Sequence, residues 1–216
     1  MDAYEKLYNC RDINKIIDSI NDMLPTSACT CCHGRYHVLY VVGITEYILH
    51  SLSHDARTIE LGKIAALLHD IGSIAGRRNH AQKGSALASV LLDDLTSVTT
   101  EEKSMIVQAI EDHSAGNNIS SAIGAAVFIA DKVHIIKRRV RLTEDIDPWH
   151  INLLEMEDME LCISGNTMTI NFMTTGVFSK ELLLSEYKSK LELIAEAAKY
   201  LGCICHINFN GTTGGF

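Results

Sequence analysis

Long apolar runs are missing from this chain of 216 residues. No segment offers the ~20 unbroken apolar residues of a transmembrane helix, so we expect no membrane association through a spanning helix. The N-terminus MDAYEKLYNC also lacks the apolar stretch of a signal peptide, which predicts a cytoplasmic protein. Positive charge is scarce as well: 19 Lys and Arg face 27 Asp and Glu, for a formal net charge of −8. We therefore expect no general affinity for nucleic-acid backbone or for anionic membranes.

The cysteines lack the regular spacing of a disulfide framework. Their odd count of seven is typical of a protein from a reducing compartment. Three of them fall in CTCCHGRYH, residues 29–37, beside two histidines. A structural zinc site would need two ligand pairs at suitable spacings, and this stretch has neither. Structural zinc remains an alternative, but we expect Cys29, Cys31 and Cys32 to be helix-entry residues or thiols near a metal site.

Only two prolines interrupt the chain, Pro25 and Pro148. Between them, apolar residues recur with a helical period, which predicts helices over residues 34–52, 55–72, 80–95, 99–114 and 119–140, after an opening helix over residues 4–24. After residue 158 the period changes to two. Residues 159–173 alternate around SGN and predict a β-hairpin, followed by a helix over 179–202 and a strand over 203–211.

These patterns predict a mainly α fold with a small C-terminal appendage. We assign residues 1–28 to an N-terminal helix, 29–145 to a helical bundle core, and 146–216 to a ββαβ appendage packed on that core. The chain shows no repeats, low-complexity tracts or long linkers.

Candidate chemistry centres on AALLHDIGS, where His69 and Asp70 end an apolar helix. Two strongly polar side chains in that position need partners, and a metal ion would satisfy both. Imidazole and carboxylate together suit Mn, Fe, Co, Ni or Zn better than Ca. Further donors occur at the edges of the other predicted helices: His33, His37, His80, His113 and Asp131. Bundle cores build metal sites from such inward-pointing groups on several helices.

The order of these residues resembles the HD superfamily of metal-dependent phosphohydrolases. HGRYHVLYV is similar to the first-ligand helix of that family, LLHDIG to its defining doublet, and HAQKGSALA to its second-metal histidine. AIEDHS and ADKV match its last two ligand positions. The resemblance covers roughly residues 30–140 and implies an HD-type helical core.

Carried over to this chain, the resemblance implies two divalent transition-metal ions, with Mn, Fe, Co and Ni as candidates. It places the first ion on His37, His69, Asp70 and Asp131. It places the second on His80 and His113, with Asp70 bridging the two. His33, one turn before His37, would be an extra ligand or would hold a ligand in place.

The implied activity is hydrolysis of a phosphate ester or anhydride by a metal-activated water, with Asp70 and Lys83 as catalytic residues. Arg77, Arg78, Lys83 and Lys132 are the cations expected to contact the substrate phosphate. The expected partner is a phosphorylated small molecule, with a nucleotide as one candidate, and a homodimer is one candidate assembly. His134, one turn after Asp131, falls outside the family pattern, and we expect it to be structural.

The sequence differs from patterns of the HD superfamily in three features. Ser73 stands where a lysine often follows the doublet, Ser114 stands where cyclic-dinucleotide hydrolases have a second histidine, and their GYP signature is absent. These differences count against cleavage of cyclic dinucleotides. Two alternatives keep the same ligand pattern: a di-iron oxygenase, in which the ions activate oxygen, and a non-catalytic HD module used in signalling.

Overall fold

The computed structural model describes residues 1–24, 31–115, 119–141, 152–175 and 180–214. Its first part is helical, with α1 (Ala3–Tyr8), α2 (Arg11–Met23), α3 (Arg35–Ser51), α4 (Ala56–Leu68), η1 (Ile71–Ala75), α5 (His80–Asp93), α6 (Thr100–Ala115) and α7 (Ala122–Val133). The second part contains the short turns η2 (Lys137–Arg139) and η3 (Asn152–Glu155), then β1 (Met156–Ser164), β2 (Thr167–Thr174), α9 (Lys180–Tyr200), β3 (Ile204–Phe209) and β4 (Thr212–Gly214). The predicted fold, a helical core with a small C-terminal sheet and helix, is confirmed.

The helix predicted over residues 4–24 is in fact two helices. The Asn9 N–H donates to carbonyls of α1 and ends it, and Cys10 then takes an extended conformation before α2. Two other predicted helices were too long. The helix predicted over 55–72 ends at Leu68 and gives way to η1. That predicted over 119–140 ends at Val133, because His134 leaves the helical region at φ −78° and ψ 58°.

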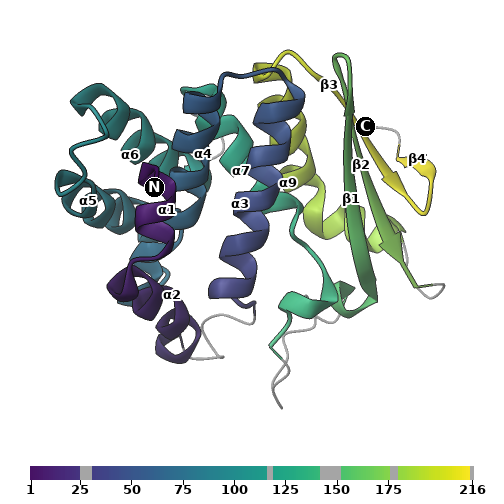
Figure 1. Cartoon of the computed structure of the whole chain (residues 1–216). Helices are drawn as coiled ribbons and strands as arrows, with labels where there is room; N and C mark the ends of the chain where they lie inside the picture. The colour runs from purple at the N-terminus through teal and green to yellow at the C-terminus, as the bar shows by residue number, and fades with distance from the viewer. Residues whose placement is uncertain (25–30, 116–118, 142–151, 176–179, 215–216) are drawn as a thin grey trace.

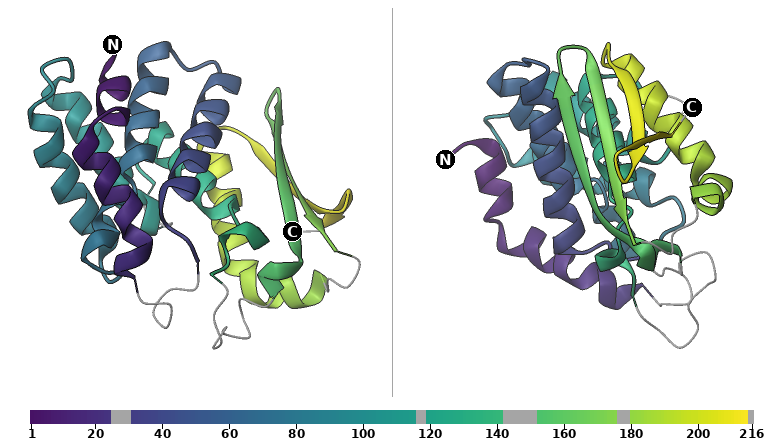
Figure 2. Two further views of the ribbon diagram at one scale, coloured as in Figure 1. Left: turned by 60° about the horizontal axis from the view of Figure 1, so that its bottom comes forward. Right: turned by 90° about the vertical axis from the view of Figure 1, so that its right-hand side faces the viewer.

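The C-terminal part forms a four-stranded sheet in the order β1-β2-β3-β4. β1 and β2 are the predicted antiparallel hairpin, and Gly165 makes its turn at φ +57°. β3 runs parallel to β2, so the chain must cross over between them, and α9 is that crossover. β4 was not predicted and pairs antiparallel with β3. α9 lies between the sheet and the helical core (Figures 1 and 2).

Two apolar clusters share helix α7. One face of α7, including Val127, packs with α1 to α6. The opposite face, including Phe128, packs with α9 and with buried sheet residues such as Ile170 and Phe172. The alternating burial of β1 and β2 is what presents one apolar face of the sheet to α9. Through α7, the C-terminal sheet and α9 support the helices that carry the candidate site.

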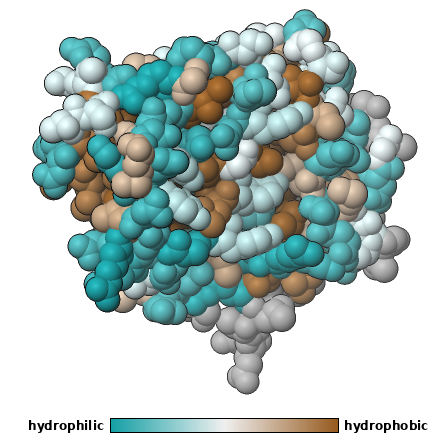
Figure 3. Space-filling view, in the orientation of Figure 1, coloured by the Kyte–Doolittle hydropathy of each residue, from teal (hydrophilic) through white to brown (hydrophobic). Residues whose placement is uncertain are grey.

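The face seen in Figure 3 is mostly polar, with apolar residues in small separate groups. No helix among the described residues has both the length and the apolar composition needed to cross a membrane. Pro25, Cys29 and Pro148 lie outside the described residues. The predicted domain boundaries near residues 28 and 145 also fall in undescribed segments, so they stay predictions.

Candidate metal centre

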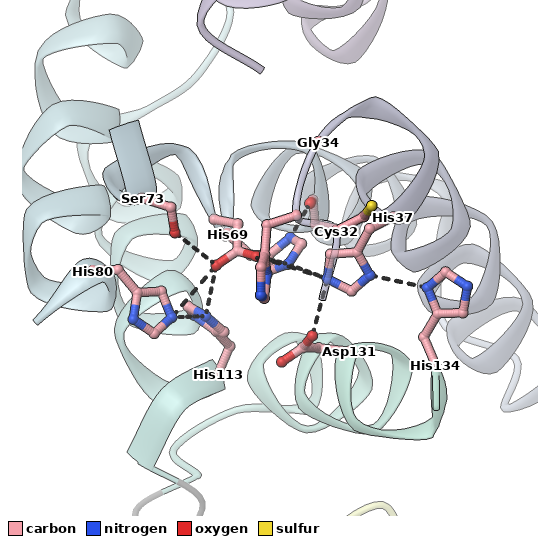
Figure 4. A network of polar contacts seen from close by, with 12 residues as sticks. Cys32, Gly34, His37, His69, Ser73, His80, His113, Asp131 and His134 are labelled. Carbon is pink, nitrogen blue, oxygen red and sulfur yellow. Dashed lines mark hydrogen bonds and ion pairs between the residues drawn. The ribbon is translucent and has the colours of Figure 1, made fainter. Parts of the chain in front are cut away.

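The histidines and aspartates singled out from the sequence come together from several helices (Figure 4). Each of these residues is at most 9% exposed. They are His33 and His37 at the start of α3, His69 and Asp70 between α4 and η1, His80 at the start of α5, His113 near the end of α6, and Asp131 in α7. Seven residues spread over 99 positions of the sequence therefore line one buried centre.

The start of α3 is held by a side chain from α2. Asn21 Oδ1 accepts the backbone N–H groups of His33, at 2.8 Å, and Gly34, at 3.1 Å. The N–H of Gly34, the N-cap residue of α3, is one of the groups that a helix start leaves without an intrahelical partner. A Cβ at Gly34 would lie 2.8 Å from Asn21 Nδ2, so glycine permits this close approach. The contact sets where His33 and His37 enter the centre.

The glycine that follows the His-Asp doublet has a packing role. A Cβ at Gly72 would lie 2.2 Å from the His80 carbonyl oxygen and 2.3 Å from the Gly84 nitrogen. Only glycine lets η1 lie so close to the backbone of α5. Because His80 is the first residue of α5, this contact sets its distance from Asp70.

Asp70 lies in the middle of the centre, and its two carboxylate oxygens face different histidines. Oδ2 lies 2.6 Å from His33 Nδ1, 3.5 Å from His69 Nε2 and 3.8 Å from His37 Nε2. Oδ1 lies 3.4 Å from His80 Nε2 and 3.8 Å from His113 Nε2. One carboxylate thus joins two groups of imidazoles.

The first group contains His37, His69 and Asp131, and we call it the inner group. His37 Nε2 lies 3.2 Å from His69 Nε2 and 3.1 Å from Asp131 Oδ1. His69 Nδ1 donates to the Ala66 carbonyl oxygen at 2.7 Å, which leaves the lone pair of its Nε2 facing the centre.

The second group contains Asp70, His80 and His113, and we call it the outer group. The Nε2 atoms of His80 and His113 lie 3.1 Å apart. His80 Nδ1 donates to the Arg77 carbonyl at 3.0 Å, and His113 Nδ1 donates to the Ile110 carbonyl at 2.5 Å. Both rings therefore present Nε2 lone pairs to the same point.

The family of this part of the chain follows from a comparison of its sequence with family models. The model of the HD domain matches residues 34–136, the span that contains six of the seven residues of the centre. This part of the chain is an HD domain. The HD domain and its buried His/Asp centre together support a metal-dependent hydrolase as the kind of protein.

Similarity to curated proteins and to solved structures says less about this HD domain than the match to the family model does. No curated protein matches the chain. A crystal structure of a predicted HD superfamily hydrolase from an uncultured Thermotogales bacterium is similar, with 23% identity and a TM-score of 0.46. That similarity covers 63% of this chain and 75% of the other.

The donor atoms of the HD domain fit divalent metal ions. The two facing Nε2 lone pairs of His80 and His113 cannot form a hydrogen bond with each other, because neither carries a proton. A cation between them satisfies both lone pairs and the nearby carboxylate. Three sets of donors each have ligand atoms within 4.8 Å of one another: the inner group, the outer group, and His33 with His37 and Asp70. The number and identity of the ions stay predictions.

Burial keeps the outer imidazoles neutral. It lowers the pKa of His113 to about 3 and that of His80 to about 4. For Asp70, burial alone would raise the pKa, but His33, His69 and Arg77 hold it well below its usual value. Lys132 and His37 do the same for the pKa of Asp131, which is also buried. These pKa shifts leave the two outer imidazoles neutral and the two carboxyl groups ionised, as metal ligands require.

The predicted substrate cations lie in different places. Arg77 Nη1 donates to Asp70 Oδ1 at 2.7 Å and to Ser73 Oγ at 2.8 Å, and Lys132 Nζ lies 2.6 Å from Asp131 Oδ2. Both therefore touch the centre. Arg78 is exposed, and the exposed Lys83 donates to the Ala75 carbonyl. Their roles as substrate residues, and that of Lys83 in catalysis, stay predictions.

One cation near the centre was missed in the sequence. Lys190 of α9 is partly buried, and burial together with the charge of Lys132 lowers its pKa. The charge of Asp131 raises the same pKa, so Lys190 interacts electrostatically with a residue of the inner group. No motif marks Lys190 in the sequence, because only the packing of α9 on α7 brings it there.

The cysteines of the N-terminal cluster contribute backbone contacts. The Cys32 N–H donates to the Arg139 carbonyl at 2.7 Å, and the Arg139 guanidinium donates to the Cys32 carbonyl at 3.1 Å. Cys31 pairs with Val140 in an isolated β-bridge. These contacts fix the strand that leads to His33, as expected for residues at a helix entry. None of the candidate metal-ligand sets among the described residues includes a cysteine.

Proposed function

We propose that this protein hydrolyses a phosphate ester or anhydride of a small molecule, with a nucleotide as the leading candidate, at a centre of two divalent transition-metal ions. The observation that carries this proposal is the position of Asp70. Its two oxygens face two separate groups of imidazoles, which is the arrangement of a bridging carboxylate. A single-ion site would need neither the outer imidazoles nor a second set of facing lone pairs.

His37, His69, Asp70 and Asp131 would hold one ion, and Asp70, His80 and His113 the other. When bound, a metal pair supplies a nucleophilic water at neutral pH and neutralises charge on phosphoryl oxygens. The chain supplies the rest. Buried carboxylates and neutral imidazoles give the centre its donors, and carbonyl partners fix the orientation of three of the four imidazoles in the two groups.

Two cations hold the ligand carboxylates. Arg77 and Ser73 both donate to Asp70 Oδ1, so this oxygen is oriented from the side of η1. Lys132 donates to Asp131 Oδ2, which leaves Oδ1 facing His37. An ammonium has three donors, so Lys132 can also donate to a phosphate oxygen of the substrate.

The proposed substrate is anionic because cations gather beside the inner group. Lys132 comes from α7 and Lys190 from α9, and the charge of Lys132 lowers the pKa of Lys190. Arg78 and Lys83 lie on the exposed surface beside η1 and α5. A phosphate group is the natural partner for such a set of cations in a protein with a net charge of −8.

Elemental analysis of protein purified without added metal or chelator is the first test. Wild-type protein should contain about two transition-metal ions per chain, and His80→Ala about one. Phosphate release should then be measured across nucleoside mono-, di- and triphosphates and non-nucleotide phosphate esters. Iron as the main metal, with oxygen consumption and no phosphate release, would indicate an oxygenase instead. A chain that neither contains nor takes up metal would indicate a non-catalytic module.

A further inference from the structure

A histidine outside the HD pattern contacts one of the proposed ligands. His134, immediately after α7, places its Nδ1 3.0 Å from Nδ1 of His37, and the two rings are nearly parallel, at 17° (Figure 4). Both residues are fully buried. Nε2 of His37 faces the opposite way, toward Asp131 and His69.

His37 differs from the other imidazoles of the two groups in its Nδ1 partner. Nδ1 of His69, His80 and His113 faces a backbone carbonyl of its own chain segment. A carbonyl can only accept, so these three rings must carry the proton on Nδ1. The partner of His37 is an imidazole nitrogen, which can either accept or donate.

The direction of this hydrogen bond determines whether His37 can be a ligand. If His134 donated, the proton of His37 would lie on Nε2, and the lone pair would point away from the inner group. If His37 donates, its Nε2 lone pair faces Asp131 and His69, and His134 carries its own proton on Nε2. That Nε2 is buried and has no hydrogen-bond partner among the described residues. Either direction leaves this Nε2 unpaired, so the lone pair that a metal ligand needs, and not the surroundings of Nε2, selects the direction in which His37 donates.

The position of His134 is fixed on two sides. Its ring stacks on Tyr40 with a centroid distance of 3.6 Å and an angle of 10°. Its carbonyl accepts Nη1 of Arg139 at 2.9 Å, and the same guanidinium donates to the carbonyl of Cys32. The ring therefore stays beside His37 independently of the hydrogen bond between them.

We propose that His134 is a positioning residue for the inner group: its Nδ1 accepts the Nδ1 proton of His37 and so directs the Nε2 lone pair of His37 into the centre. This inference rests on the proposed metal centre. It assigns a role to a histidine that the sequence pattern left as structural.

Two variants separate the hydrogen bond from the packing. His134→Phe keeps a ring to stack on Tyr40 but has no acceptor, whereas His134→Asn can offer a carbonyl oxygen near the position of Nδ1. His50→Phe, at an exposed histidine of α3, is the control. Cobalt(II) binding to metal-free protein is followed by visible absorption, and thermal unfolding is measured with chelator.

His134→Phe should weaken one of the two cobalt-binding events about 10- to 100-fold, as is typical when the partner of a ligand is removed, and should alter its visible bands. The affinity of the other binding event should stay within about threefold of wild type. Both affinities of His134→Asn and of the control should also stay within that range, which is smaller than the effect expected for His134→Phe. Equal binding by wild type and His134→Phe would refute the role of His134, as would an asparagine variant as weak as the phenylalanine variant. Wild-type protein that takes up no cobalt would instead overturn the metal centre itself.

A second measurement needs no variant and so does not depend on folding of the phenylalanine protein. Long-range ¹H–¹⁵N NMR of the zinc-loaded protein reports which ring nitrogen of each histidine carries a proton. The expected result is a proton on Nδ1 of His37 and on Nε2 of His134. A proton on Nδ1 of His134 would overturn the inference.

Discussion

The inner and outer groups of the centre hold their imidazoles in different ways. In the outer group, both histidines donate to carbonyls next to their own helix positions, and Asp70 supplies the carboxylate. In the inner group, His69 has a carbonyl partner but His37 depends on His134, a side chain from another helix end. The imidazoles of the outer group are therefore oriented by local contacts, whereas His37 of the inner group is oriented by a side chain from the end of α7.

This difference predicts that the two groups are disrupted by different substitutions. The inner group lies where α3 and α7 meet, and α7 also packs on α9 and the sheet. The outer group depends on the close approach of η1 to α5 at Gly72. Changes that leave one group intact while disabling the other can therefore test whether two separate ion sites exist.

Removing the carboxylate shared by the two groups should have the largest effect. Asp70→Asn is expected to lose both ions and to lower phosphate release by more than the roughly 100-fold typical of residues that only support a ligand. Elemental analysis and activity measure this. Asp93→Asn, at an exposed ion pair with Lys103, is the control and should keep both ions. Retention of one tightly bound ion in Asp70→Asn would contradict a shared carboxylate.

Removing one imidazole from each group should separate the groups. His69→Gln should lose the inner ion and His113→Gln the outer ion, each leaving about one ion per chain. Cobalt titration would show which binding event disappears. Because the Nε2 atoms of His69 and His113 face different oxygens of Asp70, the two variants should lose different events. If they lost the same event, the centre would hold a single ion.

Adding one methyl group should disturb the outer group more than the inner. Gly72→Ala places a Cβ against the backbone of α5 and should destabilise the protein by about 1–3 kcal/mol, as overpacking does. It should also weaken the outer ion. Gly43→Ala, in α3 with no atom within 4 Å of the new Cβ, should be neutral or stabilise by up to ~1 kcal/mol. Equal effects of the two substitutions on unfolding would contradict a close contact at Gly72.

Acid should destabilise the metal-free protein through the outer group. The pKa of His80 is lowered to about 4 and that of His113 to about 3 by burial, against about 6.5 in the unfolded chain. Between pH 6.5 and 4 the unfolded chain thus binds protons that the folded chain does not, so stability falls as the pH falls. Denaturant unfolding in chelator at pH 7, 6 and 5 measures this. The double variant His80→Gln/His113→Gln should show a smaller pH dependence.

Substitution of Lys190 should have the smallest effect. Lys190→Gln should raise the KM for the substrate about 5- to 10-fold, the value of one hydrogen bond in a solvated position, and leave both ions bound. Lys188→Gln, an exposed lysine two residues earlier in α9, is the matched control. An unchanged KM would show that α9 contributes no contact to the substrate.

The residues of the centre were recognisable from the sequence because each stands at the edge of an apolar helix. A single polar side chain there can have a structural explanation, but six of them in one order resemble the HD pattern. The helix ends were harder to predict. Periodicity continues through Val133 into HIIKRRV, so it could not reveal that the Arg139 guanidinium binds the His134 carbonyl, at the point where the helix ends.

The sequence by itself determined the helical fold, the C-terminal hairpin and the helix that follows it, and the set of candidate metal ligands, because these depend on local periodicity and residue type. Only the tertiary structure decided which oxygen of Asp70 faces which histidine, that His134 contacts His37, and that the charge of Asp131 acts on Lys190. These relations join residues 37 and 134, or 131 and 190, that are distant in the chain. Such distances are fixed by how helices pack, and no local pattern of residues records them.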